Sequence, residues 1–238
     1  MQEDTFGQHT SRRFNEELED IRNDVMAMGG LVEKQTAEAI EALLQGDVEL
    51  ANQVIENDYQ VNHHEVSIDN KCTQLLARRQ PTATDLRFVI AVIKTITDLE
   101  RIGDQACRVA VSALKLAQME RPVNHFEEIR HLGDNVEQML RQSLDAFARF
   151  DIQKAALLSE KDEHVDIEYE GIMRQHITYM LEDPRSIKRS LQVIWAIRAI
   201  ERIGDHSQNI GEYVIYLVKG KDVRHTSPDD IQKAISES

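Results

Sequence analysis

The sequence has few aromatic residues, few prolines and few glycines for its length. Of its 238 residues, 5% are aromatic, 4 are proline and 10 are glycine. A β-sandwich of this size normally carries more aromatic side chains and more turn-forming residues, so the composition favours helices. The chain is long enough to bury a substantial core, either in one large domain or in two smaller ones.

Cysteines and long apolar runs are also scarce. The two cysteines, Cys72 and Cys107, both lie in apolar helical patterns, where a free thiol is usually a small core residue in a reducing cytosol. The longest uncharged apolar runs, residues 88–93 and 191–197, are far too short to span a membrane. The first residues are acidic and lack an apolar segment, so no signal peptide is expected. These features predict a cytoplasmic protein that does not insert into a membrane.

The chain has no excess of basic residues. It carries 28 lysines and arginines against 42 aspartates and glutamates, a net charge of −14. Such an acidic surface repels a phosphate backbone, so we expect no binding to nucleic acid. It suits cations or basic partner surfaces, although acidic residues that only keep the protein soluble explain the charge equally well.

What the sequence does contain is an internal repeat. Residues 99–104 read LERIGD and residues 200–205 read IERIGD, so that Glu201 follows Glu100 by 101 positions. Earlier in the chain, Asp47 and Asp151 match at an offset of 104 positions. The two offsets imply one short deletion, which we assign to the loop at residues 80–82. Agreement over this length indicates an internal duplication.

Each copy of the repeat reads as three long helices. Apolar residues recur every three or four positions, Gly46 and Asp47 break the first pattern, and Pro81 ends the second. We therefore predict an all-α fold of two tandem three-helix bundles, residues 1–120 and 121–238, which pack on each other or on a second chain. The expected helices span residues 11–45, 47–79, 84–119, 124–149, 152–181 and 184–219, and the bundles join at residues 120–123.

Acidic residues interrupt the apolar stripes of these helices. The third helix of each copy carries a glutamate and, four residues later, an aspartate on or near the buried face, and the second helix carries a similar pair. A carboxylate there is costly to desolvate unless a positive group meets it, and carboxylates from two facing helices can bind hard cations. The predicted metal ligands are Asp58, Asn62, Glu100 and Asp104 in copy one, and Asp162, Asp166, Glu201 and Asp205 in copy two.

Two other interpretations of these acids stay open. In a purely structural helical scaffold, nearby arginines would pair with them. In a metal-dependent enzyme they would act on a substrate, but no nucleophile, paired histidine ligand or acid–base couple accompanies them. Recurrence within an identical ERIGD motif favours metal binding, with iron, zinc, manganese or magnesium as candidates. The arginines that could form salt bridges are Arg87, Arg101, Arg108, Arg198 and Arg202.

Two glycines and the tryptophan also occupy informative positions in the helical patterns. Gly103 and Gly204 occupy matching mid-helix positions, where glycine costs about 1 kcal/mol relative to alanine. They indicate either a close approach of two helices or room for a ligand beside Asp104 and Asp205. Trp195 lies in the apolar run 191–197 and is expected in the core.

With these residues in view, the chain resembles the PhoU family of bacterial regulators of phosphate uptake and phosphate-starvation signalling. The resemblance covers essentially the whole length. Its carriers are the twin ERIGD motifs, the run ARRQPTATDLR at residues 77–87, and residues 213–225. It implies two similar three-helix bundles, often dimerised, that bind metal clusters through the acid pairs listed above. Asn62 departs from the acid that the family places there, which implies a weaker or different first site.

The resemblance also implies a function and partners. PhoU-like proteins have no enzymatic activity of their own. They restrain a phosphate-sensing histidine kinase when phosphate is plentiful, and they modulate the phosphate ABC transporter through its ATPase subunit. The sequence thus predicts a homodimeric, metal-binding signalling adaptor that acts at the inner face of the membrane without entering it.

Overall fold

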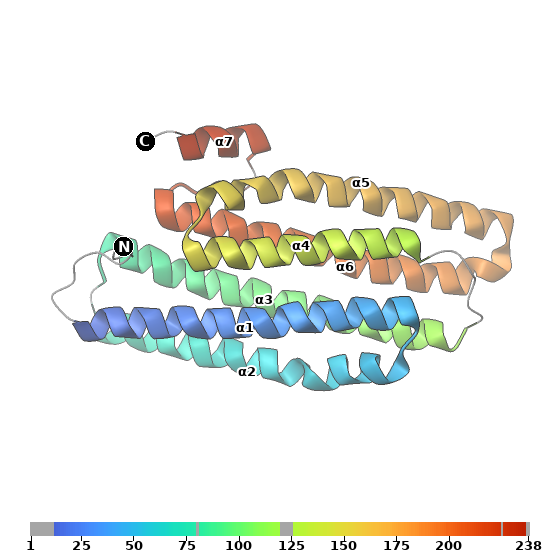
Figure 1. Cartoon of the computed structure of the whole chain (residues 1–238), viewed down its shortest axis with the longest axis horizontal. Coiled ribbons are helices and arrows are strands. Elements are labelled where there is room, and N and C mark those ends of the chain that lie inside the picture. The colour runs from blue at the N-terminus through green and yellow to red at the C-terminus, as the bar shows by residue number, and fades with distance from the viewer. Residues whose placement is uncertain (1–11, 80, 120–125, 225, 237–238) are drawn as a thin grey trace.

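The computed structural model describes residues 12–79, 81–119, 126–224 and 226–236, which form six long helices, a short 3-10 turn and one short C-terminal helix. The predicted all-α fold of two tandem three-helix bundles is confirmed (Figure 1). In the described residues, no helix combines the length and apolarity that crossing a membrane requires. The elements are α1 (Arg12–Gln45), α2 (Val48–Arg78), α3 (Ala83–Ala117), α4 (Glu127–Arg149), α5 (Ile152–Glu182), η1 (Pro184–Ser186), α6 (Ile187–Lys219) and α7 (Pro228–Ser236).

The helix boundaries follow from short polar caps that the two copies share. Asp47 accepts a hydrogen bond from the backbone N–H of Leu50 and begins α2, and Asp151 caps α5 in the same way. The last long helix was expected to begin at residue 184. Asp183 caps the chain there, but Pro184 opens the turn η1 before α6 begins. The predicted junction at residues 120–123 lies outside the described residues.

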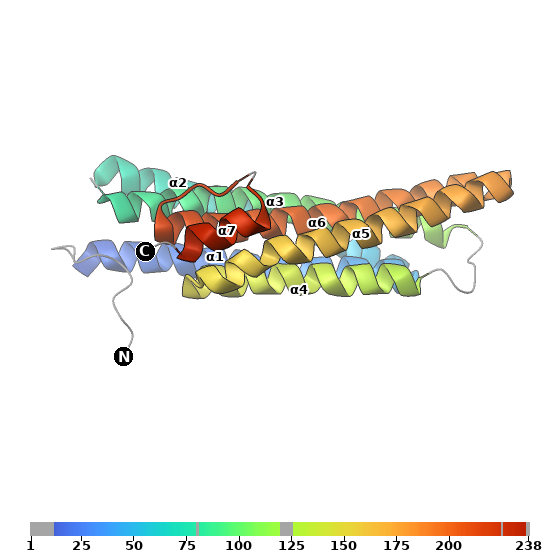
Figure 2. The same cartoon turned by 90° about the horizontal axis from the view of Figure 1, so that it is seen from above.

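Helices α3 and α6 form the centre of the molecule. Each packs against the other two helices of its own bundle, and the two make the most extensive contact with each other. The bundles lie side by side with their long axes roughly parallel, as Figures 1 and 2 show. Buried apolar side chains of both bundles belong to one continuous core. The copies are therefore packed on each other, as one of the two predicted arrangements requires.

The contact between α1 and α4 shows how the two copies are related. A Cβ atom on Gly29 of α1 would lie 2.5 Å from Leu144 of α4, and a Cβ atom on Gly133 of α4 would lie 2.8 Å from Ile40 of α1. Gly133 and Leu144 each follow their counterparts by 104 positions. This reciprocal contact is that of an approximate twofold axis between the copies, as in an isologous dimer.

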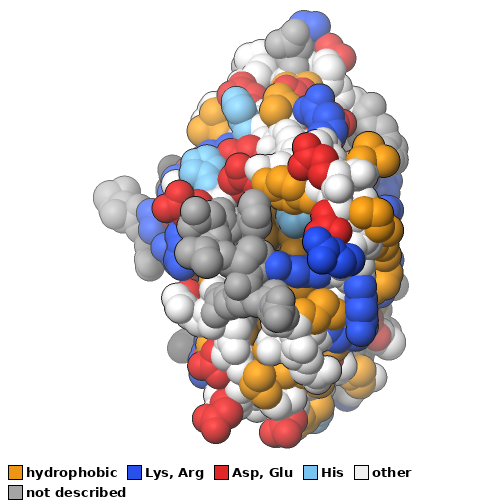
Figure 3. All heavy atoms as spheres, turned by 90° about the vertical axis from the view of Figure 1, so that its right-hand side faces the viewer, with side chains coloured by type: hydrophobic (Ala, Val, Ile, Leu, Met, Phe, Trp, Pro, Cys, Tyr) orange, Lys and Arg blue, Asp and Glu red, His pale blue; other side chains and the backbone are white. Residues whose placement is uncertain are grey.

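Two features differ from the sequence expectations. Trp195 was predicted in the core, but it lies on the outer side of α6 with half of its surface exposed. The short helix α7 was not predicted, and it covers one end of α5 by burying Ile231 and Ile235 (Figure 1). Seen from the end where α5 leads into α6, hydrophobic side chains reach the surface among acidic and basic ones (Figure 3).

Candidate metal centre

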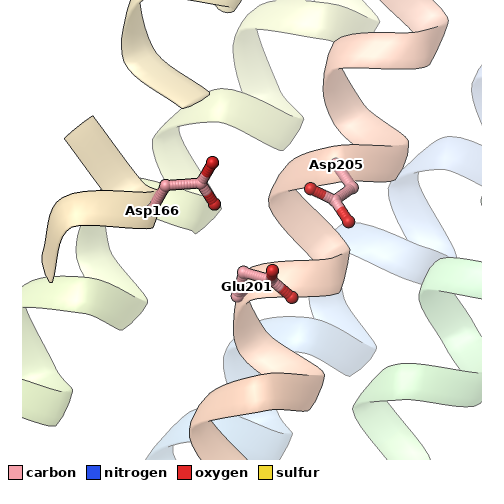
Figure 4. Close-up of side chains that lie close together, drawn as sticks. All are labelled: Asp166, Glu201 and Asp205. Atoms are coloured by element: carbon pink, nitrogen blue, oxygen red, sulfur yellow. The ribbon is translucent and has the colours of Figure 1, made fainter. Parts of the chain in front are cut away.

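The acids of copy two gather where α5 faces α6. Asp166 projects from α5 toward α6, and Glu201 and Asp205 lie on successive turns of α6 opposite it (Figure 4). One carboxylate oxygen from each of the three lies within 4.8 Å of the others. The spacing of four residues puts Glu201 and Asp205 on one helix face, so the predicted pairing of facing acids is found here.

Asp162 lies one turn before Asp166 and is more deeply buried. Its Oδ1 atom is inaccessible to solvent and has no hydrogen-bond partner. Burial, together with the negative charges of Asp205, Asp166 and Glu201, raises the pKa of this carboxyl to about 7. A buried oxygen without a donor is costly for a folded protein, so this side of the cluster lacks a positive partner.

The acids of α6 share the same environment. Burial, together with the negative charges of Asp205 and Asp166, raises the pKa of Glu201 to about 7. Burial and then Asp166 also raise the pKa of Asp205. Arg198 and Arg202 act in the opposite direction on Glu201 without offsetting these effects. The folded chain thus concentrates negative charge that its own cations leave largely uncompensated.

Salt bridges do not neutralise the predicted ligands in either copy. Among the described residues, no lysine, arginine or histidine lies within salt-bridge distance of any of the seven acids. The scaffold interpretation depended on such pairs. Of the five arginines that it named, Arg101 pairs with a different acid, Asp98, and Arg87 donates to the backbone carbonyl of Leu217.

Copy one is built differently around its equivalent acid, Asp58. The Nε2 atom of Gln35 donates to Asp58 Oδ1 at 2.9 Å, and the Nδ2 atom of Asn62 donates to Asp58 Oδ2 at 3.2 Å. Both carboxylate oxygens therefore have amide partners, unlike those of Asp162. Within the described residues, no group of three acids in copy one meets the spacing found in copy two. The predicted inequality of the two sites thus has a structural basis that includes Gln35, a residue the sequence did not single out.

Copy one contains a further acid, Glu65, outside the predicted set of ligands. Burial raises the pKa of Glu100, and the negative charges of Asp104, Glu65 and Asp58 raise it further. Glu65 thus lies close enough to influence the predicted ligands of α3. Its counterpart at an offset of 104 is Tyr169, so a search for repeated acids passes over it.

The paired glycines explain how closely the second and third helices of each bundle approach. A Cβ atom on Gly103 would lie 3.4 Å from Asp58 Oδ1, and one on Gly204 would lie 3.6 Å from Asp162 Oδ1. Close helix approach, one of the two expected roles, is therefore found. The space adjoins the acids of α2 and α5 rather than the neighbouring Asp104 and Asp205.

Comparison with known proteins identifies relatives over nearly the whole chain. The PhoU domain model matches residues 25–113 and again residues 129–214. The phosphate-specific transport system accessory protein PhoU homolog of Pseudomonas aeruginosa is 50% identical over 225 residues, which cover 94% of this chain and 93% of the relative. The accessory protein PhoU of Escherichia coli is 48% identical over 229 residues, covering 96% and 94%.

Solved structures agree with this assignment. The crystal structure of PhoU from Pseudomonas aeruginosa matches with a TM-score of 0.85 and 51% identity, covering 87% of this chain and all of that one. The phosphate transport system regulatory protein PhoU from Streptococcus pneumoniae matches with a TM-score of 0.82 and 31% identity, covering 88% and 99%. With two domain matches in tandem and relatives of this identity, the chain belongs to the PhoU family.

Proposed function

We propose that this protein is a cytoplasmic, non-enzymatic regulator of phosphate transport that holds metal ions on its clustered carboxylates. The regulatory role is supported by the full-length similarity to phosphate-specific transport accessory proteins. Metal binding is carried by one observation: Asp166, Glu201 and Asp205 meet within 4.8 Å, and no lysine, arginine or histidine of the described residues lies within salt-bridge distance of them.

The residues of copy two fit a hard cation. Asp166, Glu201 and Asp205 would hold the ion, and Asp162, whose buried Oδ1 atom has no partner, would contribute from the inner side. An all-oxygen donor set is typical of magnesium and manganese, and carboxylate-rich helical bundles also hold iron. Zinc prefers nitrogen and sulfur donors, so we rank it last of the four candidates. The ion would supply the positive charge that the cluster lacks.

The proposed regulatory partners rest on the similarity to phosphate-specific transport accessory proteins. We propose that the protein restrains a phosphate-sensing histidine kinase when phosphate is plentiful, and that it modulates the ATPase subunit of a phosphate ABC transporter. A regulator that contacts these partners from the cytoplasm needs no membrane-spanning helix, and none is found among the described residues.

The metal part of the proposal is tested by two matched double variants. Element analysis of protein purified without added metal should find bound metal in the wild type. E201Q/D205N should lose most of it, because both ligands of α6 lose their charge. E100Q/D104N changes the corresponding residues of copy one and should lose less metal, because Gln35 and Asn62 already donate hydrogen bonds to both carboxylate oxygens of Asp58 there. A wild type without metal, and without a gain in melting temperature on addition of iron, zinc or manganese, would contradict metal binding.

The regulatory part is tested in cells. Deletion of the gene should raise alkaline phosphatase and phosphate-transporter levels in phosphate-rich medium, and a plasmid copy of the gene should return both to their wild-type levels. Recovery of the kinase or the ATPase subunit with tagged protein from phosphate-replete cells would support the proposed partners. Unchanged expression in the deletion strain would count against the regulatory role, and phosphatase or oxidase activity of the pure protein would favour the enzyme interpretation instead.

A further inference from the structure

A second feature of the molecule is a groove between α3 and α6 with a volume of about 470 Å³. It is separate from the three-acid cluster of copy two. Most of its ionisable side chains are basic: Arg108 and Lys115 come from α3, and Arg198 and Arg202 come from α6. Asp104 is the one acid in the lining. In a chain with 42 acids and 28 bases, a groove with four cations and one carboxylate is unusual.

These four cations lack a salt-bridge partner in the described part of the chain, although Arg198 and Arg202 act electrostatically on Glu201. None of them forms a salt bridge or donates a side-chain hydrogen bond there, whereas most other described arginines do one or both. Lys115 instead lies over the ring of Trp195, with Nζ 5.7 Å from the ring centre. Three guanidinium groups that form no salt bridge within the described residues therefore face one cavity.

The twofold relation between the copies explains why one of these cations, Arg202, has no salt-bridge partner. At the offset of 101 positions, Arg202 corresponds to Arg101, and Arg101 lies 3.6 Å from the carboxylate of Asp98. The residue that corresponds to Asp98 is Ala199. The carboxylate that accompanies Arg101 is thus absent beside Arg202, and Ala199 itself lines the groove.

The equivalent place in copy one is occupied by a hydrogen-bond network. Asp98 is buried, and it accepts hydrogen bonds from His206 Nδ1 at 2.7 Å and from the Tyr213 hydroxyl at 2.7 Å. Lys94 covers the Tyr213 ring, with Nζ 5.3 Å from its centre. At the same offset, His206 and Tyr213 correspond to Gln105 and Ser112, two smaller groups in the open groove. One half of the interface is therefore closed by a charge-satisfied network and the other half is open and cationic.

The groove also has an apolar wall. Trp195 is 50% exposed at its edge, and Val111 beside it is 38% exposed. A tryptophan is costly to leave in water, and its flat ring offers a stacking surface to an aromatic ligand. Arginine and aromatic side chains together are also the residues that dominate binding energy at recognition sites.

We propose that this groove binds an oligophosphate, and that the natural ligand is a nucleoside polyphosphate. Guanidinium groups bind phosphate oxygens in pairs of charge-assisted hydrogen bonds, and several unpaired arginines in one cavity suit a ligand whose negative charges are closely spaced. The volume lies in the range of small-molecule sites. The phosphates contact Arg108, Arg198 and Arg202, and the base lies against Trp195. This site does not depend on metal at the carboxylate cluster, so either proposal can fail without the other.

Intrinsic fluorescence tests the proposal directly, because Trp195 is the single tryptophan of the chain. We would titrate the full-length protein with ATP, pyrophosphate and orthophosphate in the presence of a chelator, which prevents a metal ion from bridging phosphate to the acids. ATP should change the emission of Trp195 in a saturable way and should bind more tightly than orthophosphate. Its binding should weaken as the salt concentration is raised. Calorimetry on W195A should show weaker ATP binding but unchanged pyrophosphate binding.

Three variants separate the groove from the rest of the surface. R108Q/R198Q removes two exposed cations and should lower the affinity for ATP by about tenfold or more. R101Q is the matched control, since Arg101 is the counterpart of Arg202 but lies outside the groove, and its affinity should equal that of the wild type. A199D restores the carboxylate that copy one has, so it should weaken ATP as well. Circular dichroism would verify that each variant is folded.

Several results would overturn the assignment. They are the absence of any saturable response to ATP and pyrophosphate, an equal loss of affinity in R101Q and R108Q/R198Q, and loss of binding in E201Q/D205N but not in R108Q/R198Q. A polyglutamate peptide that binds as tightly as ATP at the same salt would assign the groove to an acidic protein segment instead. Equal affinity for ATP and pyrophosphate in both wild type and W195A would support an oligophosphate site whose ligand is inorganic.

Discussion

Replacement of Asp162 by asparagine should stabilise the metal-free protein at pH 8, although it removes a predicted ligand. The Oδ1 atom of Asp162 is buried without a hydrogen-bond partner, and the pKa of the carboxyl rises from 3.8 to about 7. In the unfolded chain this group ionises near its ordinary pKa, whereas the folded chain holds its proton until about pH 7. The fold therefore loses stability as pH rises between these two values, and the full penalty is present above pH 7.

The magnitude follows from the size of this shift. A difference of about three pKa units corresponds to about 4 kcal/mol for a fully buried group. The side chain of Asp162 is partly exposed, and solvent screening reduces the effect, so we expect a gain of about 1–3 kcal/mol in D162N. For a chain of this length, such a gain raises the melting temperature by about 3–10 °C. The gain should shrink as pH falls toward 4, where the folded state is protonated and the unfolded chain is about half protonated.

Asp58 provides the matched control in copy one. Gln35 and Asn62 each donate to one of its oxygens, and the asparagine of D58N can accept at only one of these positions. D58N should therefore lose about 1 kcal/mol under the same conditions. Thermal melts of both variants and the wild type with excess chelator, at pH 8 and near pH 4, measure these differences. If D162N melts no higher than the wild type at pH 8, or gains as much at pH 4, the buried carboxylate is not the cause. With saturating manganese, the order of D162N and wild type should reverse, because the wild type binds the ion more tightly.

Three further predictions concern assembly, pH and packing. We expect a homodimer, because apolar side chains such as Leu181 and Ile187 are exposed at the end of the molecule. Light scattering should therefore give twice the chain mass of 27.3 kDa, and a particle with the mass of one chain at tens of micromolar protein would contradict the prediction. Burial raises the pKa of Glu212 to about 7, so the stability of the wild type should fall as pH rises from about 4.5 to 7. The variant E212Q should remove about 1–3 kcal/mol of that fall, and parallel pH–stability curves for the two proteins would refute this prediction. Denaturant melts should show G211A destabilised by about 1–3 kcal/mol, because its Cβ atom would lie 2.6 Å from Leu158 and 3.1 Å from the Ala155 carbonyl. The control G171A has nothing within 4 Å of its Cβ atom and should gain up to about 1 kcal/mol. Equal effects of the two substitutions would exclude close packing as the cause.

Most of the fold could be predicted from the sequence because helical signals are local. Apolar residues every three or four positions locate the helices, and caps such as Asp47 and Asp151 fix where they begin. Trp195 was misplaced because α6 is apolar on several sides, and periodicity alone does not tell which side a neighbouring helix covers. In the structure, Val193 and Ala196 face the core, whereas Trp195 lies outside it.

The candidate site was predicted to the extent that its residues recur. Glu201 and Asp205 stand out because they repeat Glu100 and Asp104, and the structure brings them together with Asp166. Residues that occur in one copy gave no such signal. Gln35 corresponds to Met139, and its donation to Asp58 is visible only in three dimensions. Whether either cluster holds metal stays a prediction.

The burial of α3 against α6 also bears on the history of the chain. Across an approximate twofold axis, each of these helices covers a face that a single repeat would leave in water, so an ancestral gene that encoded one repeat had to make a protein that paired with itself. Joining two such genes made that pairing intramolecular and independent of protein concentration. From then on the halves were free to diverge, and the residues Asp98 in one copy and Ala199 in the other record that divergence at a single position.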